Sequence, residues 1–194
     1  MTAEPIQPVE IFYSYAHEDE RLRKQLENHL SSLKQEGLIT GWYDRDIRAG
    51  AKWASEIEAH LNSARIILLL VSPAFMASEY CTSIEMKRAL EREEVGEAHV
   101  IPILLRHVDW ERSPIGKLQA LPKDAKPVTD WPNRDKAFVD IVKGIRKAIS
   151  ELKPTSSADP TSSPQSLHHA LHSRKRHPKF DLSAGSSRRR PGSP

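Results

Sequence analysis

The sequence predicts an α/β fold in which a parallel β-sheet is covered by helices on both faces. Two observations lead to this prediction. Short β-branched or aliphatic segments alternate with segments of helical spacing between residues 9 and 152, which is the pattern of repeated strand-helix units. The most apolar segment, RIILLLV at residues 65–71, is an uninterrupted aliphatic run, which is typical of a central parallel strand buried on both faces.

The first part of the chain is predicted to contain two strands, each followed by a helix. Residues 9–15 (VEIFYSY) and residues 38–43 (LITGWY) are rich in β-branched and aromatic residues and form the strands. A charged loop that contains Gly50, DRDIRAGAK at residues 44–52, precedes the second helix. The apolar residues that mark the two helices are Leu22, Leu26, Leu30 and Leu33 for the first, and Trp53, Ile57, Leu61 and Ala64 for the second.

The second part of the chain supplies three more strands and two more helices. The central strand at residues 65–71 is predicted to stop at Ser72-Pro73. The elements expected after it are a helix from Ser78 to about Glu93, a strand at residues 98–105, a short edge strand at residues 126–128 and a helix at residues 138–152. Five strands of this length suit the flavodoxin-like order 2-1-3-4-5.

The composition changes at Pro154. Residues 8–153 form the predicted domain, whereas residues 154–194 are rich in Pro, Ser and Arg, so we expect a disordered tail. The tail carries seven basic and two acidic residues, and residues 1–153 carry 22 basic and 24 acidic residues, so the basic charge belongs to the tail. A single cysteine, no apolar run that could span a membrane and no secretory signal indicate a cytoplasmic protein.

The predicted topology indicates where a ligand would bind. In open parallel sheets, ligands bind beyond the carboxyl ends of the strands where the strand order reverses, which here lies between the first and third strands. Ser14, Tyr15 and Ala16 end the first of these strands, and Ser72 ends the other. The alternative is structural: Ser14 terminates the strand and Tyr15 covers the core.

A glutamate is predicted to point toward this edge. Cys81 and Glu85 are four residues apart on the predicted helix after the third strand, so they share a face. Because burying a carboxylate is costly unless it is paired or used, Glu85 is a candidate functional residue. The alternative is a surface ion pair between Glu85 and Arg88.

Several other functions are disfavoured. The chain has neither a GxGxxG nor a Walker A sequence, so no glycine-rich phosphate loop is expected. A phosphoacceptor domain of this strand order needs acidic residues where this chain has Ser14-Tyr15 and Ser72. No metal site is expected from the tail histidines, which lack a cysteine or carboxylate cluster. An adaptor role of the basic tail toward nucleic acid or a membrane surface is the weakest hypothesis, since the arginine run lacks interleaved aromatic residues.

With these residues assembled, the chain resembles a Toll/interleukin-1 receptor (TIR) domain of the bacterial type over about residues 8–152. VEIFYSYAHED is similar to the first sequence box of that family, an apolar strand that ends in a Ser-Tyr or Ser-His pair. The stretch GWYDRDIRAGAKWASEIEAHLNSARIILLLVSPAFMASEYCTSIEMKRAL resembles its continuation: an acidic, glycine-containing BB loop, a helix that begins with Trp, the LLLVSP strand and a helix that carries the glutamate.

The resemblance implies two functions. Many TIR domains cleave NAD⁺ at the bond between nicotinamide and ribose, frequently after self-association because the site is built across two subunits, and others act only as scaffolds that bind further TIR domains. In catalytic members the glutamate that corresponds to Glu85 is essential. NAD⁺ would then be the substrate, and no resident cofactor or metal is implied.

The resemblance also implies substrate-binding positions. Tyr15 and the BB-loop residue Arg48 match positions that line the NAD⁺ pocket. Catalytic members often carry an aromatic residue four positions before the glutamate. Here that place is Cys81, and Tyr80 precedes it. The residues predicted to bind NAD⁺ are therefore Ser14, Tyr15, Ala16, Arg48, Ser72 and Tyr80.

Overall fold

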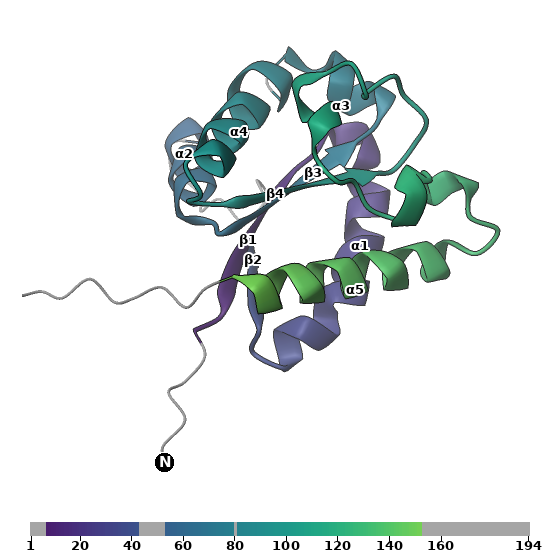
Figure 1. Ribbon diagram of the computed structural model, residues 1–194, viewed down its shortest axis with the longest axis horizontal. Helices are drawn as coiled ribbons and strands as arrows, with labels where there is room; N and C mark the ends of the chain where they lie inside the picture. Colours follow the sequence, from purple (N-terminus) through teal and green to yellow (C-terminus); the bar gives the residue numbers. More distant parts are fainter. Residues whose placement is uncertain (1–6, 43–52, 80, 153–194) are drawn as a thin grey trace, which may run out of the picture. The chain divides into compact units, whose positions relative to one another are not determined.

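A four-stranded parallel sheet forms the centre of the domain in the computed structural model, which describes residues 7–42, 53–79 and 81–152 (Figure 1). The strand order is β2-β1-β3-β4, and all three neighbouring pairs are parallel. The predicted parallel α/β architecture is thereby confirmed. The predicted tail and the loop at residues 44–52 lie outside the described residues. The strands are β1 (Val9–Ser14), β2 (Ile39–Trp42), β3 (Ile66–Val71) and β4 (His99–Leu104).

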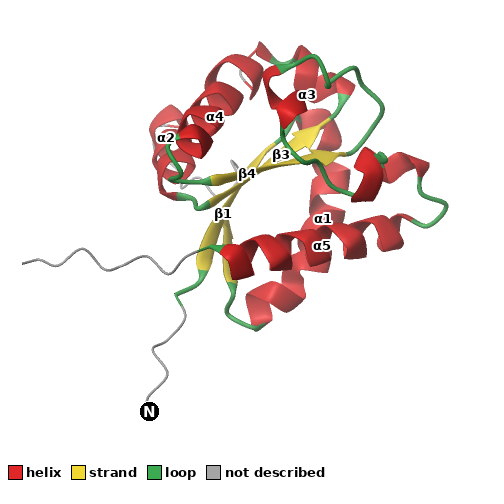
Figure 2. Cartoon of the chain, viewed as in Figure 1, coloured by secondary structure: helices red, strands yellow, loops and turns green. Residues whose placement is uncertain are grey.

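Helices cover both faces of this sheet (Figure 2). On one face lie α1 (Glu20–Gln35) and α5 (Arg134–Glu151), whose apolar residues share one core cluster. The other face carries a second core cluster, to which α2 (Trp53–Ser63), α3 (Pro73–Ala77) and α4 (Met86–Glu94) contribute. Strand β3 serves both clusters because its side chains alternate: Ile66, Leu68 and Leu70 belong to the first cluster, and Ile67, Leu69 and Val71 to the second.

The prediction of a fifth strand at residues 126–128 is wrong. Val128 begins a 3₁₀ helix, η6 (Val128–Asp130), and Leu121 instead forms an isolated parallel bridge with Ile103 beside β4. The Leu121 amide donates to the Pro102 carbonyl at 2.8 Å, and its carbonyl accepts from the Leu104 amide at 2.8 Å. The pairing does not continue into a strand, because the next amide that could extend it, that of Lys123, donates to Asp140 Oδ2 at 2.7 Å and begins a 3₁₀ turn.

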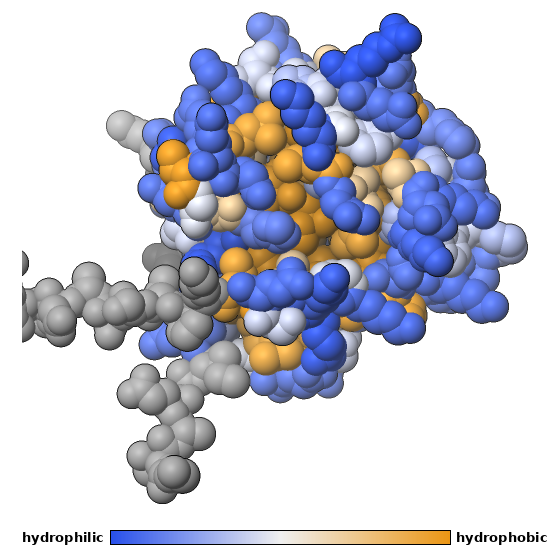
Figure 3. Space-filling model, in the orientation of Figure 1, coloured by the Kyte–Doolittle hydropathy of each residue, from blue (hydrophilic) through white to orange (hydrophobic). Residues whose placement is uncertain are grey.

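The residues of β4 from Val100 to Leu104 are buried. Beside this strand, between α4 and α5, apolar residues gather on the surface and polar residues surround them (Figure 3). This is the edge at which the sequence predicts a fifth strand.

The helix predicted from Ser78 to Glu93 is also interrupted. Ser72 caps the short helix α3, with its hydroxyl accepting from the Phe75 amide at 3.0 Å. A π-helical turn, η3 (Cys81–Glu85), then precedes α4, and the Ser78 hydroxyl accepts from the Cys81 amide at 3.3 Å. Such turns are wider than an α-helix and are frequent at functional sites.

In residues 7–42, 53–79 and 81–152, no helix is long and apolar enough to cross a membrane.

Candidate functional site

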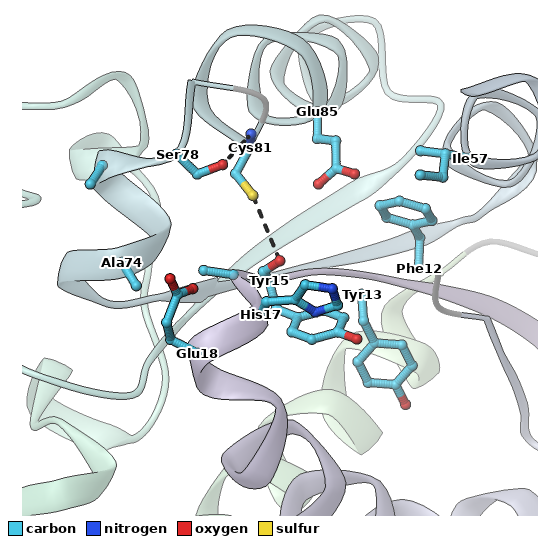
Figure 4. A pocket seen from close by; sticks show the side chains of 12 residues that line it. Phe12, Tyr13, Tyr15, His17, Glu18, Ile57, Ala74, Ser78, Cys81 and Glu85 are labelled. Carbon is cyan, nitrogen blue, oxygen red and sulfur yellow. Dashed lines mark hydrogen bonds between the residues drawn. The ribbon is translucent and has the colours of Figure 1, made fainter. Parts of the chain in front are cut away.

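A pocket of about 410 Å³ opens at the carboxyl end of β1, at the edge where the topology predicts a ligand (Figure 4). Its walls come from β1, from the 3₁₀ turn η1 (His17–Asp19) that follows β1, and from α2, α3 and η3. A volume of this size lies in the range of small-molecule sites. The lining residues are Phe12, Tyr13, Tyr15, Ala16, His17, Glu18, Ile57, Ala74, Ala77, Ser78, Cys81 and Glu85.

Glu85 is a buried carboxylate in the wall of this pocket. Glu85 is the last residue of the π-helical turn η3, and it is 6% exposed. The hydroxyl of Ser14, the last residue of β1 and itself 0% exposed, donates a hydrogen bond to Glu85 Oε2. This hydrogen bond offsets part of the cost of burying the carboxylate and fixes its orientation.

The alternative of a surface ion pair between Arg88 and Glu85 is not what the structure shows. Arg88 Nε donates to Asn62 Oδ1 at 2.7 Å, and Arg88 Nη1 lies 3.2 Å from Glu91 Oε2. The guanidinium of Arg88 is thus directed to exposed partners on the helix surface, whereas Glu85 faces the sheet and the pocket.

Tyr15 is held on both its backbone and its ring. The Cys81 thiol donates to the Tyr15 carbonyl with a sulfur-oxygen distance of 3.6 Å, which ties the end of β1 to η3. The guanidinium carbon of buried Arg23 lies 5.5 Å from the centroid of the Tyr15 ring, a cation–π contact.

The same buried arginine belongs to a small charged network in α1. Arg23 Nη1 lies 2.8 Å from Glu27 Oε2, and Lys34 Nζ lies 2.9 Å from Glu27 Oε1. Burial alone would raise the pKa of Glu27, but the hydrogen bonds and positive charges of Lys34 and Arg23 outweigh it and hold that pKa below its ordinary value.

Ser72 lies next to the site but not in the pocket lining. Its hydroxyl caps α3 and donates to the carboxylate of Asp19, which is 0% exposed. Asp19 Oδ1 also lies 3.2 Å from Arg106 Nε, just beyond the end of β4. Ser72 therefore connects the end of β3 to η1, and Asp19 connects η1 to the residue after β4.

The other residues predicted to bind NAD⁺ fall into two groups. Tyr15 and Ala16 line the pocket together with Glu85. Arg48 and Tyr80 lie outside the described residues. Within the described parts of the chain, no group of three or more His, Cys, Asp and Glu side chains could hold a metal ion.

His17, in the pocket lining, and Asp19, next to it, are not among the residues that the sequence predicts for this site. Both stand in the acidic run HEDE directly after the first strand. One signal for His17 was available, since it immediately follows the Ser14-Tyr15-Ala16 strand end. Nothing in the run distinguishes the buried Asp19 from its exposed neighbour Glu18.

These features define a class: a parallel α/β domain with its pocket at the reversal of strand order. Comparison with known proteins then gives the family. The family model described as "TIR domain" matches residues 11–144, so the chain belongs to the TIR-domain family. The resemblance inferred from the sequence is confirmed.

One known protein is similar in sequence to most of this chain. The chain is 52% identical over 150 residues to "Uncharacterized protein y4lF" of Sinorhizobium fredii (strain NBRC 101917 / NGR234), an alignment that covers 77% of this chain and 46% of that protein. The chain thus spans less than half the length of that relative.

A solved TIR-domain structure shows the same fold. The TIR domain of the Toll-related receptor TRR-2 from Hydra magnipapillata superimposes with a TM-score of 0.52 at 22% identity, covering 72% of this chain and 97% of that one. The TIR domains of the activated Roq1 resistosome, which recognises the pathogen effector XopQ, give a TM-score of 0.42 at 24% identity over 49% of this chain and 56% of that one.

Proposed function

We propose that this TIR domain is an NAD⁺ glycohydrolase that cleaves the bond between nicotinamide and ribose, with Glu85 as the catalytic carboxylate. The observation that carries the proposal is the burial of Glu85 in the pocket wall and its orientation by the Ser14 hydroxyl. The other acidic residue in the lining, Glu18, is exposed to solvent.

The chemistry suits one buried carboxylate. The nicotinamide of NAD⁺ is a cationic leaving group: when the bond from C1′ breaks, the electron pair goes to the ring nitrogen and neutral nicotinamide departs. The barrier lies in the positive charge that develops on the ribose as an oxocarbenium ion. A fixed carboxylate beside C1′ stabilises that charge, and its interaction is stronger in a site of low dielectric than in water.

The walls of the pocket suit the rest of the substrate. Phe12 and Ile57 are apolar and buried, and they lie beside Glu85 in Figure 4. The ring of Tyr15 can border a planar base; Arg23 contacts that ring, and Cys81 holds the Tyr15 backbone carbonyl. These groups supply the few polar contacts and the apolar surface that a nucleotide pocket needs.

The decisive test replaces Glu85 by glutamine. Glu85→Gln is nearly isosteric and keeps an acceptor for the Ser14 hydroxyl, so the fold should survive, while the negative charge is lost. We expect release of nicotinamide from NAD⁺ to fall by at least about 100-fold. The matched control is Glu91→Gln on the exposed face of α4, which should release nicotinamide at the wild-type rate. A folded Glu85→Gln protein that cleaves NAD⁺ at the wild-type rate would refute the assignment.

The second candidate is a non-catalytic scaffold that acts by binding other TIR domains. Cys81 favours it, because this residue occupies the place where catalytic members often carry an aromatic side chain. The same assay separates the two functions when it is run over a series of protein concentrations with sedimentation of each sample. Self-association without nicotinamide release at any concentration would establish the scaffold, whereas specific activity that rises with association would favour a catalytic assembly.

A further inference from the structure

We infer that His17 is the general base of this pocket. It binds the attacking water molecule and takes a proton from it when the water adds to C1′ of the ribose. This inference rests on the proposed NAD⁺ cleavage and assigns a second chemical role at the same site. Glu85 would act on bond breaking, and His17 on what replaces nicotinamide.

His17 differs from every other histidine in the described part of the chain. The other four each have a ring nitrogen within reach of a carboxylate oxygen: His29 with Asp135 at 3.2 Å, His60 with Glu10 at 2.6 Å, His99 with Glu93 at 3.6 Å and His107 with Asp130 at 2.5 Å. The ring of His17 has no hydrogen-bond or ion-pair partner among the described residues. Its nitrogens therefore remain available to a ligand or a water molecule.

The position of His17 makes this availability relevant to the site. Its side chain is exposed and lines the pocket. In Figure 4 the His17 ring points into the opening from the β1–η1 side, and the Glu85 carboxylate points into it from the η3 side. The two side chains thus approach the same space from opposite walls, as the two carboxyl groups of a glycosidase do.

The backbone that carries His17 is firmly anchored. The Asp19 amide donates to the Ala16 carbonyl at 2.9 Å, which closes the η1 turn. The buried Asp19 carboxylate accepts from Ser72 and pairs with Arg106, so the turn is fixed to the ends of β3 and β4. A side chain on such a turn keeps its place relative to the pocket, although the side chain itself is exposed.

In the proposed step, water adds to C1′ and loses one proton. Once nicotinamide has left, the oxygen of water forms a bond to C1′ of the oxocarbenium ion while one of its protons passes to the unprotonated ring nitrogen of His17. The products are ADP-ribose and an imidazolium, which returns the proton to solvent. Imidazole is the side chain most often used for such proton transfers. Among the described residues that line the pocket, the acidic ones are Glu18, next to His17 in sequence, and Glu85 on the opposite wall.

A competing nucleophile separates this role from that of Glu85. 3-Acetylpyridine attacks C1′ through a nitrogen lone pair and has no proton to lose, so it needs no base, whereas water does. With the full chain, NAD⁺ and 3-acetylpyridine, we expect His17→Gln to raise the ratio of exchange product to ADP-ribose by about tenfold or more, since a general base contributes roughly 10²- to 10⁴-fold. Free imidazole should restore ADP-ribose formation in His17→Ala. The matched control is His99→Gln, at the opposite end of the sheet, which should leave the ratio unchanged.

Three results of this assay would count against the role of His17. An unchanged ratio in His17→Gln, with nicotinamide still released, overturns the role of His17 and leaves the proposed function intact. An equal loss of both products shows that His17 only supports the pocket, and it too overturns the role. If the wild-type protein releases no nicotinamide, the proposed function fails and this inference fails with it. Thermal unfolding of each variant confirms that the fold is retained, and His17→Asn repeats the test should His17→Gln not fold.

Discussion

Ser14 reaches Glu85 across 71 positions of sequence, and this one hydrogen bond joins the end of the first strand to the π-helical turn. Both residues are buried, so water does not replace either partner. The hydroxyl fixes one carboxylate oxygen. At the scale of single residues, the orientation of the buried Glu85 carboxylate thus depends on a neutral neighbour, the Ser14 hydroxyl.

Removing the Ser14 hydroxyl should lower activity without unfolding the protein. Ser14→Ala leaves the Glu85 carboxylate without this donor, and a lost hydrogen bond to a buried group costs about 1–3 kcal/mol. If about half of this appears in the transition state, nicotinamide release falls by roughly two- to twelvefold, mainly in kcat, because the substrate pocket keeps its shape. Steady-state kinetics of Ser14→Ala beside the exposed control Ser83→Ala test this. Equal kcat values for the two variants would show that Ser14 has no part in positioning Glu85.

At the scale of elements, the long connection after β4 supports the wall that carries Glu85. It contributes Ile115 and Trp110, both buried, to the core cluster that also contains Phe75 of α3 and Met86 of α4. Short 3₁₀ turns and close backbone contacts hold it there, in place of a regular strand.

Gly116 is the position where this packing is tightest. A Cβ atom placed on Gly116 would lie 1.9 Å from the carbonyl oxygen of Glu111 and 2.5 Å from its carbonyl carbon, so the backbone would have to move. We expect Gly116→Ala to lower the free energy of unfolding by about 1–3 kcal/mol, as overpacked substitutions do. Urea unfolding measures the change, with the exposed Gln119→Ala as control, which should stay within about 0.5 kcal/mol of wild type. A Gly116→Ala protein as stable as that control would contradict the described backbone contact.

At the scale of the whole domain, charged contacts join the elements on one face of the sheet. Arg146 of α5 holds the Glu36 carboxylate after α1 with two hydrogen bonds of 2.6 and 2.8 Å, and His29 of α1 lies 3.2 Å from Asp135 of α5. Nearer the pocket, Glu27 accepts from Arg23 and Lys34. Arg146 lowers the pKa of Glu36 and the neighbours of Glu27 lower the pKa of Glu27, so both carboxyls link stability to pH. Because the Glu36 pair is exposed and screened by solvent, the half-buried Glu27 network is expected to contribute more.

The sign of that pH dependence follows from the lowered pKa of Glu27. Its folded-state pKa lies below the ordinary value of 4.5, so the ionised form stabilises the fold above that value, and the contribution is lost as pH falls through the folded pKa. We expect Glu27→Gln to lower the Tm at about pH 7, and the difference from wild type to shrink toward zero below about pH 4. Thermal unfolding from about pH 7 to about pH 3, with the exposed Glu58→Gln as control, tests this. A difference that stays constant across the range would mean that Glu27 acts by packing alone.

The sequence by itself determined the layers of this domain and the edge that carries its pocket. Apolar periodicity is a local property, so it gave β3 as a central strand and placed Tyr15 and Ala16 at the end of β1. A helical repeat also predicts that Glu85 shares a face with Cys81, but only the structure decided between a buried Glu85 and a surface ion pair with Arg88.

The tertiary structure decided which groups meet. Ser14 and Ser72 have the same type of side chain at the ends of neighbouring strands, yet Ser14 donates to Glu85 in the pocket wall and Ser72 donates to Asp19, which does not line the pocket. The unpaired ring of His17 and the absence of a regular fifth strand within the described residues follow equally from distant partners. Hydrogen bonds between residues far apart in sequence depend on how the elements pack, and no local pattern encodes that choice.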